Sequence, residues 1–202
     1  MSRILAIVAA LAAVGFLGWS YWMGQLRGPY AECGAGAVAG GAIGGPMTLV
    51  DETGAPVTEA ELLKGPALIY FGYSFCPDVC PLDNIRNADA VDILEERGFE
   101  ATPYFITLDP ERDTPAVMAE YTDNIHARLV GLTGTPQQIK AAAAAYKVVY
   151  RSHRGEGEFY SVDHTTFTYL MLPGGVFADF FRREDSADKI AERAACYLQS
   201  SG

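Results

Sequence analysis

Histidine and cysteine are scarce in this chain of 202 residues, which has three of the first and four of the second. Basic residues are also in the minority, and from residue 46 onward 13 of them face 24 acidic ones. Such an acidic domain repels nucleic acid and an anionic membrane surface, so both are disfavoured as partners. The sequence has no internal repeat, and it lacks the Arg-rich leader of a mitochondrial transit peptide.

The chain does have a long apolar run near its N-terminus. Residues 4–23 hold no charged side chain, and 20 residues of helix, at about 1.5 Å each, cross a hydrocarbon core of about 30 Å. A cleaved signal peptide is the alternative, but its apolar region is usually about 7–15 residues. Trp19, Tyr21 and Trp22 also stand where an interfacial aromatic belt would. We therefore predict a membrane anchor over residues 1–23.

The charges beside this run predict its orientation. Arg3 and the N-terminal amine precede it and Arg27 follows, which places the N-terminus in the cytoplasm by the positive-inside rule. We expect a single-pass protein of the bacterial inner membrane whose C-terminal domain faces the oxidising periplasm. Residues 24–45 are rich in Gly and Ala and predict a flexible tether. Residues 46–202 are enough for one domain with its own core.

Within this domain, apolar patterning predicts a β-α-β unit. Residues 66–73 form an almost continuous apolar run, typical of a strand buried on both faces. A helix is expected from Pro81 to Gly98, followed by a strand over residues 104–108. The apolar positions of this predicted helix are spaced by three residues: Leu82, Ile85, Ala88, Val91 and Leu94.

Other segments complete an α/β pattern. Thr114-Pro115 and Thr135-Pro136 each join a capping hydroxyl to a proline suited to the first helical position, which predicts two more helices. The remaining predictions are short strands at 47–51, 129–132 and 147–151, a short helix at 58–63, a hairpin over 165–181 and a helix from Ser186 to about Leu198. A mixed sheet flanked by helices follows, for which the thioredoxin-like fold is the simplest match.

Two cysteines lie in the loop between the buried strand and the next helix. If Pro81 takes the first helical position, Cys80 falls at the N-cap, where free backbone N–H groups and the helix dipole lower a thiol pKa. A structural disulfide between Cys76 and Cys80 would close only a five-residue loop, worth about 2 kcal/mol. Redox chemistry or metal binding is therefore favoured over a purely structural bond.

A metal site built on these thiolates needs a further ligand. Thiolates suit Cu(I), zinc or iron–sulfur chemistry, and two of them do not close a stable site. The three histidines are candidates: His126 at a helix end, His153 in a loop and His164 beside a strand. A lone histidine is more often a satisfied core or surface group, and the sequence places none of the three near Cys76.

Four short motifs stand out in this domain: FGYSFCPDVCP at 71–81, LDPERDTP at 108–115, GLTGTP at 131–136 and VDHT at 162–165. Together and in this order they resemble the Sco (SenC) family of cytochrome c oxidase assembly proteins. The resemblance covers residues 46–198, most of the outer domain.

This resemblance implies a thioredoxin-like domain that binds copper, as Cu(I) or Cu(II), through Cys76, Cys80 and His164. It implies delivery of copper to the copper A centre of oxidase subunit II, or reduction of that centre's thiols by the Cys pair. Asp78 and Asp163 are candidates to orient His164 or polarise the loop, although each also suits a turn.

Other interpretations stay open at this point. A thiol-disulfide oxidoreductase would cycle Cys76 and Cys80 without needing a histidine, and a cysteine peroxidase could use the same fold. A structural zinc site is disfavoured, because it usually has four protein ligands. Arg112 is expected to brace its loop through a salt bridge. Cys33 and Cys196 could pair, bridge two chains or stay free.

Overall fold

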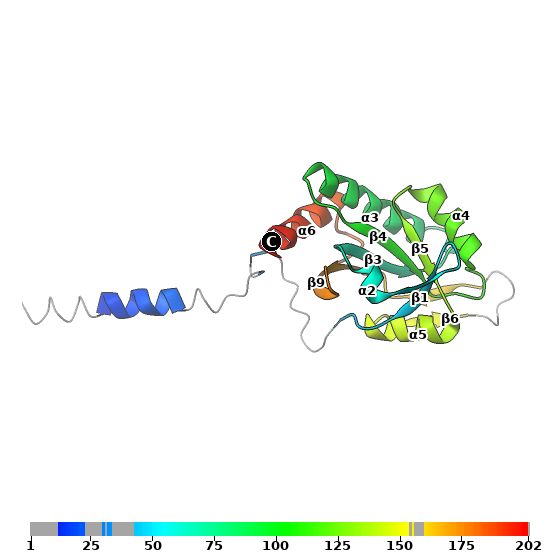
Figure 1. The fold of residues 1–202 in the computed structure, drawn as a ribbon, viewed down its shortest axis with the longest axis horizontal. Coiled ribbons are helices and arrows are strands. Elements are labelled where there is room, and N and C mark those ends of the chain that lie inside the picture. The colour runs from blue at the N-terminus through cyan, green and yellow to red at the C-terminus, as the bar shows by residue number, and fades with distance from the viewer. Residues whose placement is uncertain are drawn as a thin grey trace, which may run out of the picture.

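The computed structural model describes residues 12–22, 30, 32–33, 43–153, 155 and 160–201. A seven-stranded mixed sheet lies at the centre of the domain, in the order β2-β1-β5-β4-β3-β8-β9 (Figure 1). The inner strands β3, β4 and β5 run parallel, and β8 pairs antiparallel with β3. The strands are β1 (Thr48–Asp51), β2 (Pro56–Thr58), β3 (Ala67–Gly72), β4 (Thr102–Thr107), β5 (Val130–Thr133), β8 (Thr168–Leu172) and β9 (Val176–Phe181).

Helices cover both faces of this sheet. Helices α3, α4 and α6 lie on one side and α5 on the other (Figure 1). Ring contacts mark the two layers: Phe105 of β4 stacks on Tyr121 of α4, whereas Phe71 of β3 packs on Tyr146 beside α5. The helices are α2 (Glu59–Leu62), α3 (Val79–Glu96), α4 (Pro115–Ile125), α5 (Pro136–Ala145) and α6 (Ala187–Ser201). The predicted sheet between helices is confirmed.

Local sequence signals account for several of these elements. All six residues of β3 are buried, as its unbroken apolar run predicted. The helices after the two Thr-Pro pairs begin where expected, since Thr114 and Thr135 each accept a hydrogen bond from the backbone N–H three residues on. Ser186 does the same for Lys189 at the start of α6.

The predicted strand at 147–151 is only partly correct. Lys147 adopts a left-handed conformation with φ of 58°, which interrupts extended backbone at that point. The strand β6 (Tyr150–Ser152) therefore starts later, and it pairs with β7 (Val162–His164) in a separate two-stranded ribbon. Tyr150 lies opposite His164 in this ribbon, outside the seven-stranded sheet.

The start and the outer face of α3 differ from the prediction. The helix begins at Val79 with Asp78 at the N-cap, so Cys80 is its second residue and the N-cap prediction for Cys80 is wrong. Leu82 and Ile85 are exposed, although their spacing grouped them with the core. A spacing of three advances about 300° around a helix, so a series of such steps drifts away from one face.

The N-terminal predictions fall largely outside the described residues. Residues 1–11 and 23 of the predicted anchor are not described, and residues 12–22 are helical. No helix in the described part of the chain is long and apolar enough to cross a membrane. Among the predicted tether residues that are described, Cys33 is buried and forms a disulfide with Cys196 of α6, which decides the pairing that the sequence left open.

Candidate functional site

The Cys loop leaves the sheet at the carboxyl end of β3, where Gly72 makes room for it. A Cβ built on Gly72 would lie 2.7 Å from the Cys80 Sγ and 2.8 Å from the Phe105 ring, closer than real Cβ contacts. Cys80 is fully buried beside this glycine, and Cys76 is 9% exposed. The absence of a side chain at Gly72 therefore lets Cys80 pack directly on the sheet.

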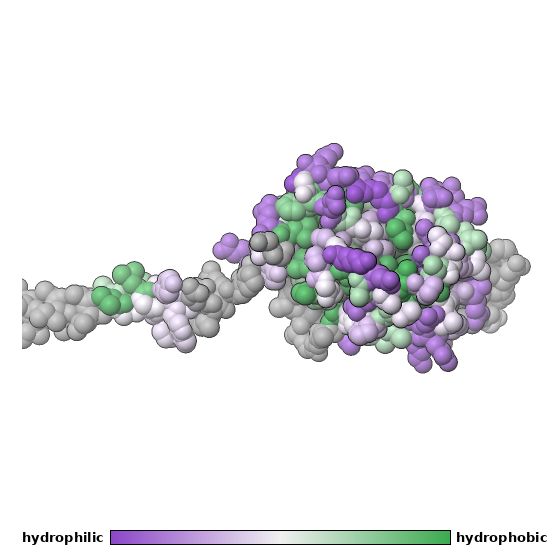
Figure 2. Space-filling view, viewed as in Figure 1, coloured by the Kyte–Doolittle hydropathy of each residue, from purple (hydrophilic) through white to green (hydrophobic). Residues whose placement is uncertain are grey.

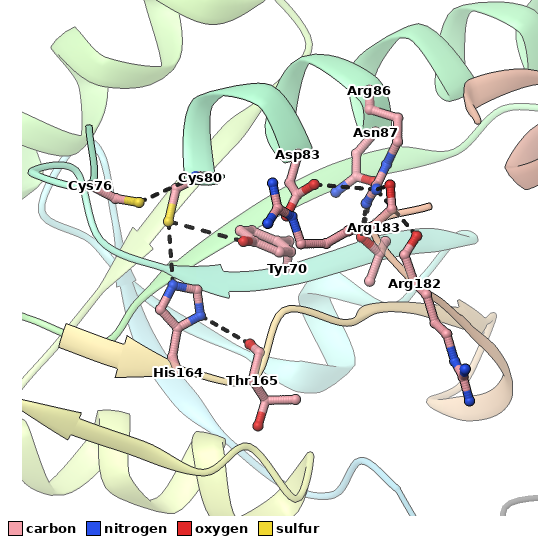
Figure 3. Close-up of polar contacts among 11 residues, drawn as sticks. Tyr70, Cys76, Cys80, Asp83, Arg86, Asn87, His164, Thr165, Arg182 and Arg183 are labelled. Atoms are coloured by element: carbon pink, nitrogen blue, oxygen red, sulfur yellow. Dashed lines mark hydrogen bonds and ion pairs between the residues drawn. The ribbon is translucent and has the colours of Figure 1, made fainter. Parts of the chain in front are cut away.

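The structure brings together the two cysteines and one histidine that the resemblance implied. The Cys80 Sγ lies 3.4 Å from the Nε2 of His164, and the Cys80 backbone N–H donates to the Cys76 Sγ at 3.3 Å (Figure 3). Both cysteines are free thiols. His164 reaches them from β7, 84 residues beyond Cys80.

The histidine ring is held in one orientation. Its Nδ1 lies 2.9 Å from the Thr165 carbonyl oxygen, which can only accept, so Nδ1 carries the proton and Nε2 faces the sulfur (Figure 3). Tyr70 and Tyr73 each place a ring against the imidazole at a centroid distance of 6.1 Å. The Tyr70 hydroxyl also lies 4.0 Å from the Cys80 Sγ. The imidazole is thus prepared to offer an Nε2 lone pair toward the thiols.

The two thiols have opposite acidities. Hydrogen bonding from the Cys80 side chain, together with backbone N–H groups, lowers the pKa of Cys76 to about 3 although burial opposes this. The same contact with Cys76, together with burial, raises the pKa of Cys80 well above its usual value. Cys76 is therefore a thiolate at neutral pH, and Cys80 holds the remaining proton.

The spacing of the sulfur and nitrogen atoms suits a shared metal ion. Within the described residues, no group of three or more His, Cys, Asp or Glu side chains is already arranged to hold a metal ion. However, ligands at about 2.3 Å (S) and 2.1 Å (N) from one ion lie about 3.6–3.8 Å apart at ordinary coordination angles. The Cys80 Sγ to His164 Nε2 distance of 3.4 Å needs only a few tenths of an ångström of adjustment.

Arg112 braces its own loop through a salt bridge, as predicted, and it also holds the loop that precedes the cysteines. Its guanidinium forms an ion pair with Asp109. The same group lies 4.6 Å from the centroid of the Phe75 ring and 3.7 Å from that of Tyr160. The salt bridge therefore also fixes an aromatic side chain adjacent to Cys76.

Asp113 anchors the same loop and escaped the sequence prediction. Its carboxylate accepts hydrogen bonds from the Ser74 backbone N–H at 3.0 Å, from the Ser74 hydroxyl and from the Thr107 hydroxyl at 2.5 Å. Burial raises the pKa of this carboxyl group. The signal was available in the LDPERDTP motif, where Asp113 is one of three acidic residues, but nothing there distinguished it.

Asp83 forms a second polar group missed from sequence, beneath the cysteines on the inner face of α3. It is 3% exposed and pairs with Arg86 at 3.2 Å and Arg183 at 3.5 Å (Figure 3). Burial raises the pKa of Asp83, and the nearby arginines favour its charged form. Burial raises the pKa of Tyr70 and the charge of Asp83 adds to this rise, so this buried carboxylate acts on the ring beside Cys80.

Two predicted neighbours of the site point elsewhere. Asp163 precedes His164 in β7, and successive strand residues face opposite sides. Its carboxylate accordingly bonds the Nε2 of His153 at 2.8 Å. Asp78 has an exposed carboxylate, and the contact it makes with the Cys76 Sγ comes from its backbone.

The remaining histidine is also accounted for. His126 ends α4 and bonds Asp92 of α3 at 3.0 Å, which fits the helix-end position expected for it. His164 is therefore the histidine that the fold places at the cysteines.

A free Cys-x-x-x-Cys pair at the start of a helix, with a distant histidine against it, defines a protein that handles thiols or soft metals. The SCO1/SenC family model matches residues 36–199, and the chain belongs to this family.

Individual relatives agree with this membership. Protein SenC of Rhodobacter capsulatus is 48% identical over 172 residues, covering 85% of this chain and 78% of the relative. Arabidopsis thaliana ScoI, solved with copper bound, is 39% identical with a TM-score of 0.74, over 78% of this chain and 99% of that one. BsSco, described as a member of the Sco family of cytochrome c oxidase assembly proteins, is 21% identical with a TM-score of 0.64, over 78% and 92%. The thioredoxin-like fold is thereby confirmed.

Proposed function

We propose that this protein is a copper metallochaperone whose ligands are Cys76, Cys80 and His164. The observation that carries the proposal is the approach of the His164 Nε2 to within 3.4 Å of the Cys80 Sγ, with the Cys76 Sγ held beside it. Two soft thiolates and one imidazole suit Cu(I), and they also serve Cu(II). The copper-bound ScoI structure supports copper as the cargo.

The site is suited to passing its metal on. Cys76 is already a thiolate and Cys80 loses its proton when the ion binds, because metal ligation requires deprotonated sulfur. Three protein ligands leave the ion open to a fourth group from outside. An incoming thiolate or imidazole can therefore bind the copper before the ligands of this chain release it.

The recipient we propose is the copper A domain of cytochrome c oxidase subunit II. The motifs around the cysteines and His164 support it through the Sco resemblance. BsSco, a member of the Sco family of cytochrome c oxidase assembly proteins, also supports a recipient in oxidase assembly.

We further propose that residues 1–23 anchor the protein in the bacterial inner membrane and that the domain faces the periplasm. The uncharged run at 4–23 and the positive-inside rule support the anchor and its orientation. The Cys33–Cys196 disulfide supports an oxidising compartment.

A second function uses the same sulfurs: reduction of a disulfide, including that of the copper A cysteines. The free thiols and their opposite pKa shifts favour it. The Cys76 thiolate would attack one sulfur of the target to form a mixed disulfide and release one target thiolate. Cys80, on losing its proton, would then attack the Cys76 Sγ and release the second. The chain ends with a Cys76–Cys80 disulfide, and the target gains two electrons from the two sulfurs and two protons, one from Cys80 and one from water.

Copper titration of the full chain in detergent separates the two functions. We expect one copper per chain with a thiolate charge-transfer band, and loss of that band in Cys76→Ala and Cys80→Ala. His164→Ala should lose the band and weaken Cu(II) binding at least tenfold. His153→Ala is the matched control, because its ring bonds Asp163 and should leave binding unchanged.

Unaltered copper affinity in His164→Ala would refute the ligand set. Reduction of a model disulfide that survives in His164→Ala, in a chain that binds no copper, would favour the reductase.

A further inference from the structure

In its first two turns, helix α3 carries large aliphatic side chains on its solvent face while polar side chains are buried on its inner face. Leu82 is 61% exposed and Ile85 is 42% exposed, whereas Asp83 and Asn84 are buried. Exposed aliphatic residues are common singly, but a helix that buries its polar residues and exposes its aliphatic ones on neighbouring turns has a surface without a partner.

This surface lies at the same end of α3 as the cysteine pair, on the solvent side of the helix, whereas Cys80 faces the sheet. Leu82 follows Cys80 by two residues, and Phe75, which is 49% exposed, immediately precedes Cys76. Phe75 also lines a hollow of about 250 Å³ between the loop and α4, together with Ser74, Val117, Glu120, Tyr121 and Asn124. We call Phe75, Leu82 and Ile85 the apolar rim of the site.

The ring of Phe75 is held in this exposed position. The Arg112 guanidinium lies 4.6 Å from its centroid and is itself fixed by Asp109. An exposed aromatic side chain that is already ordered loses little conformational entropy when a partner covers it.

Carboxylates border the rim along α3. Asp78 and Asp89 are exposed and, at 100° per residue, fall on the same face as Leu82 and Ile85, one before and one after them. On the neighbouring face, Arg86 and Arg183 both pair with the buried Asp83, whose single negative charge compensates one of the two positive charges. The rim is therefore apolar with acidic ends.

We propose that the apolar rim, bordered by Asp78 and Asp89, is the surface on which the copper recipient docks. This inference rests on the proposed function. Transfer by ligand exchange requires a ligand atom of the recipient to reach the ion held by Cys76, which is only 9% exposed. Whatever delivers that atom must cover the residues on either side of the loop. The partner is thus a copper-binding domain with an apolar patch around its own ligands, bordered by Lys or Arg.

Apolar surface is limited on the face of the domain that Figure 2 shows. Hydrophilic residues cover much of this face, and the hydrophobic residues form small separate areas. An excess of acidic residues over the whole domain would steer a basic partner toward it, while the rim would fix the docked position.

The test compares copper transfer from two variants of the full chain in detergent. The probe is the metal-free copper A domain of oxidase subunit II, and the readout is the rate at which its copper A absorption appears. Leu82→Ser with Ile85→Ser should slow transfer about tenfold or more at sub-saturating recipient, because the change removes both aliphatic side chains of the rim. Val176→Ser is the matched control. Val176 is 52% exposed on β9, at the end of the sheet away from the site.

The rim variant must still bind one copper with an unchanged charge-transfer band, which shows that its site is intact. Transfer at the wild-type rate from such a variant would overturn the docking surface while leaving the metallochaperone in place. If the copper-loaded wild-type chain transfers no copper, the proposed recipient is refuted, and so is the assignment of this domain as the partner that docks on the rim. Asp78→Asn with Asp89→Asn should weaken the salt dependence of the transfer rate; an unchanged dependence would overturn the acidic border.

Discussion

Gly72 and Cys80 are in contact so close that no other residue fits at position 72 without displacement. A Cβ there would stand 2.7 Å from the Cys80 Sγ and would also meet the Phe105 ring at 2.8 Å. The end of β3 thereby fixes how deeply the second cysteine sits, and with it the distance from that sulfur to His164.

Gly72→Ala tests this relationship. The added methyl must push Cys80 or Phe105 aside, which should lower the free energy of unfolding by about 1–3 kcal/mol and weaken copper binding. Gly65→Ala is the control, since a Cβ at Gly65 meets no atom within 4 Å and its φ is not positive. Chemical denaturation and copper titration give the two readouts, and equal behaviour of the two variants would contradict the prediction.

The acidity of Cys76 predicts a flat pH profile for its reaction with iodoacetamide. Because its pKa is lowered to about 3, the thiolate fraction stays close to one between pH 5 and pH 8, whereas an ordinary thiol gains reactivity tenfold per pH unit there. Cys80→Ser replaces the side chain that contributes most to this shift, so the pKa of Cys76 should rise and the profile should slope upward. The rate is followed by mass spectrometry of the Cys76 peptide. A steep wild-type profile would show that the thiol is protonated.

The Cys33–Cys196 bond should stabilise the domain without serving the site. It joins residues separated by 163 positions, and closing so long a loop destabilises the unfolded chain by about 5 kcal/mol in the entropy model. Cys33→Ser should therefore lower the melting temperature under non-reducing conditions, and reductant should bring wild type to the same value. Copper stoichiometry should not change. Equal melting temperatures in the absence of reductant would show that the bond contributes nothing.

Local patterns were sufficient for most of the main sheet and its helices. The apolar run of β3 and the Thr-Pro pairs before α4 and α5 each depend on neighbouring residues alone, and each prediction is confirmed. Residue patterns identified the cysteine loop as a site, but only the resemblance singled out His164. Its approach to Cys80 depends on the ribbon of β6 and β7, a long-range arrangement that no local signal specifies.

The exposed aliphatic residues of α3 show a case in which a local pattern gave a wrong prediction of burial. Leu82 and Ile85 obey a helical spacing and were assigned to the core, whereas the buried positions between them are Asp83 and Asn84. Hydrophobicity predicts burial only where the chain itself provides the cover. The polar residues are buried because Arg86, Arg183 and Tyr121 offer them partners. The sequence shows the aliphatic and the polar residues of α3, but it does not show which residues lie against them in the folded domain.

The disulfide at Cys33 also shortens the tether between the proposed membrane anchor and the domain. From the end of the proposed anchor at residue 23, a chain of ten residues reaches at most roughly 35 Å before it is fastened to α6, whereas a chain running free to residue 46 would reach roughly 80 Å. A site on the shorter tether stays closer to the bilayer, which would raise its effective concentration toward any recipient held in the same membrane. A covalent bond far from the cysteine loop would in this way govern how often copper finds its destination.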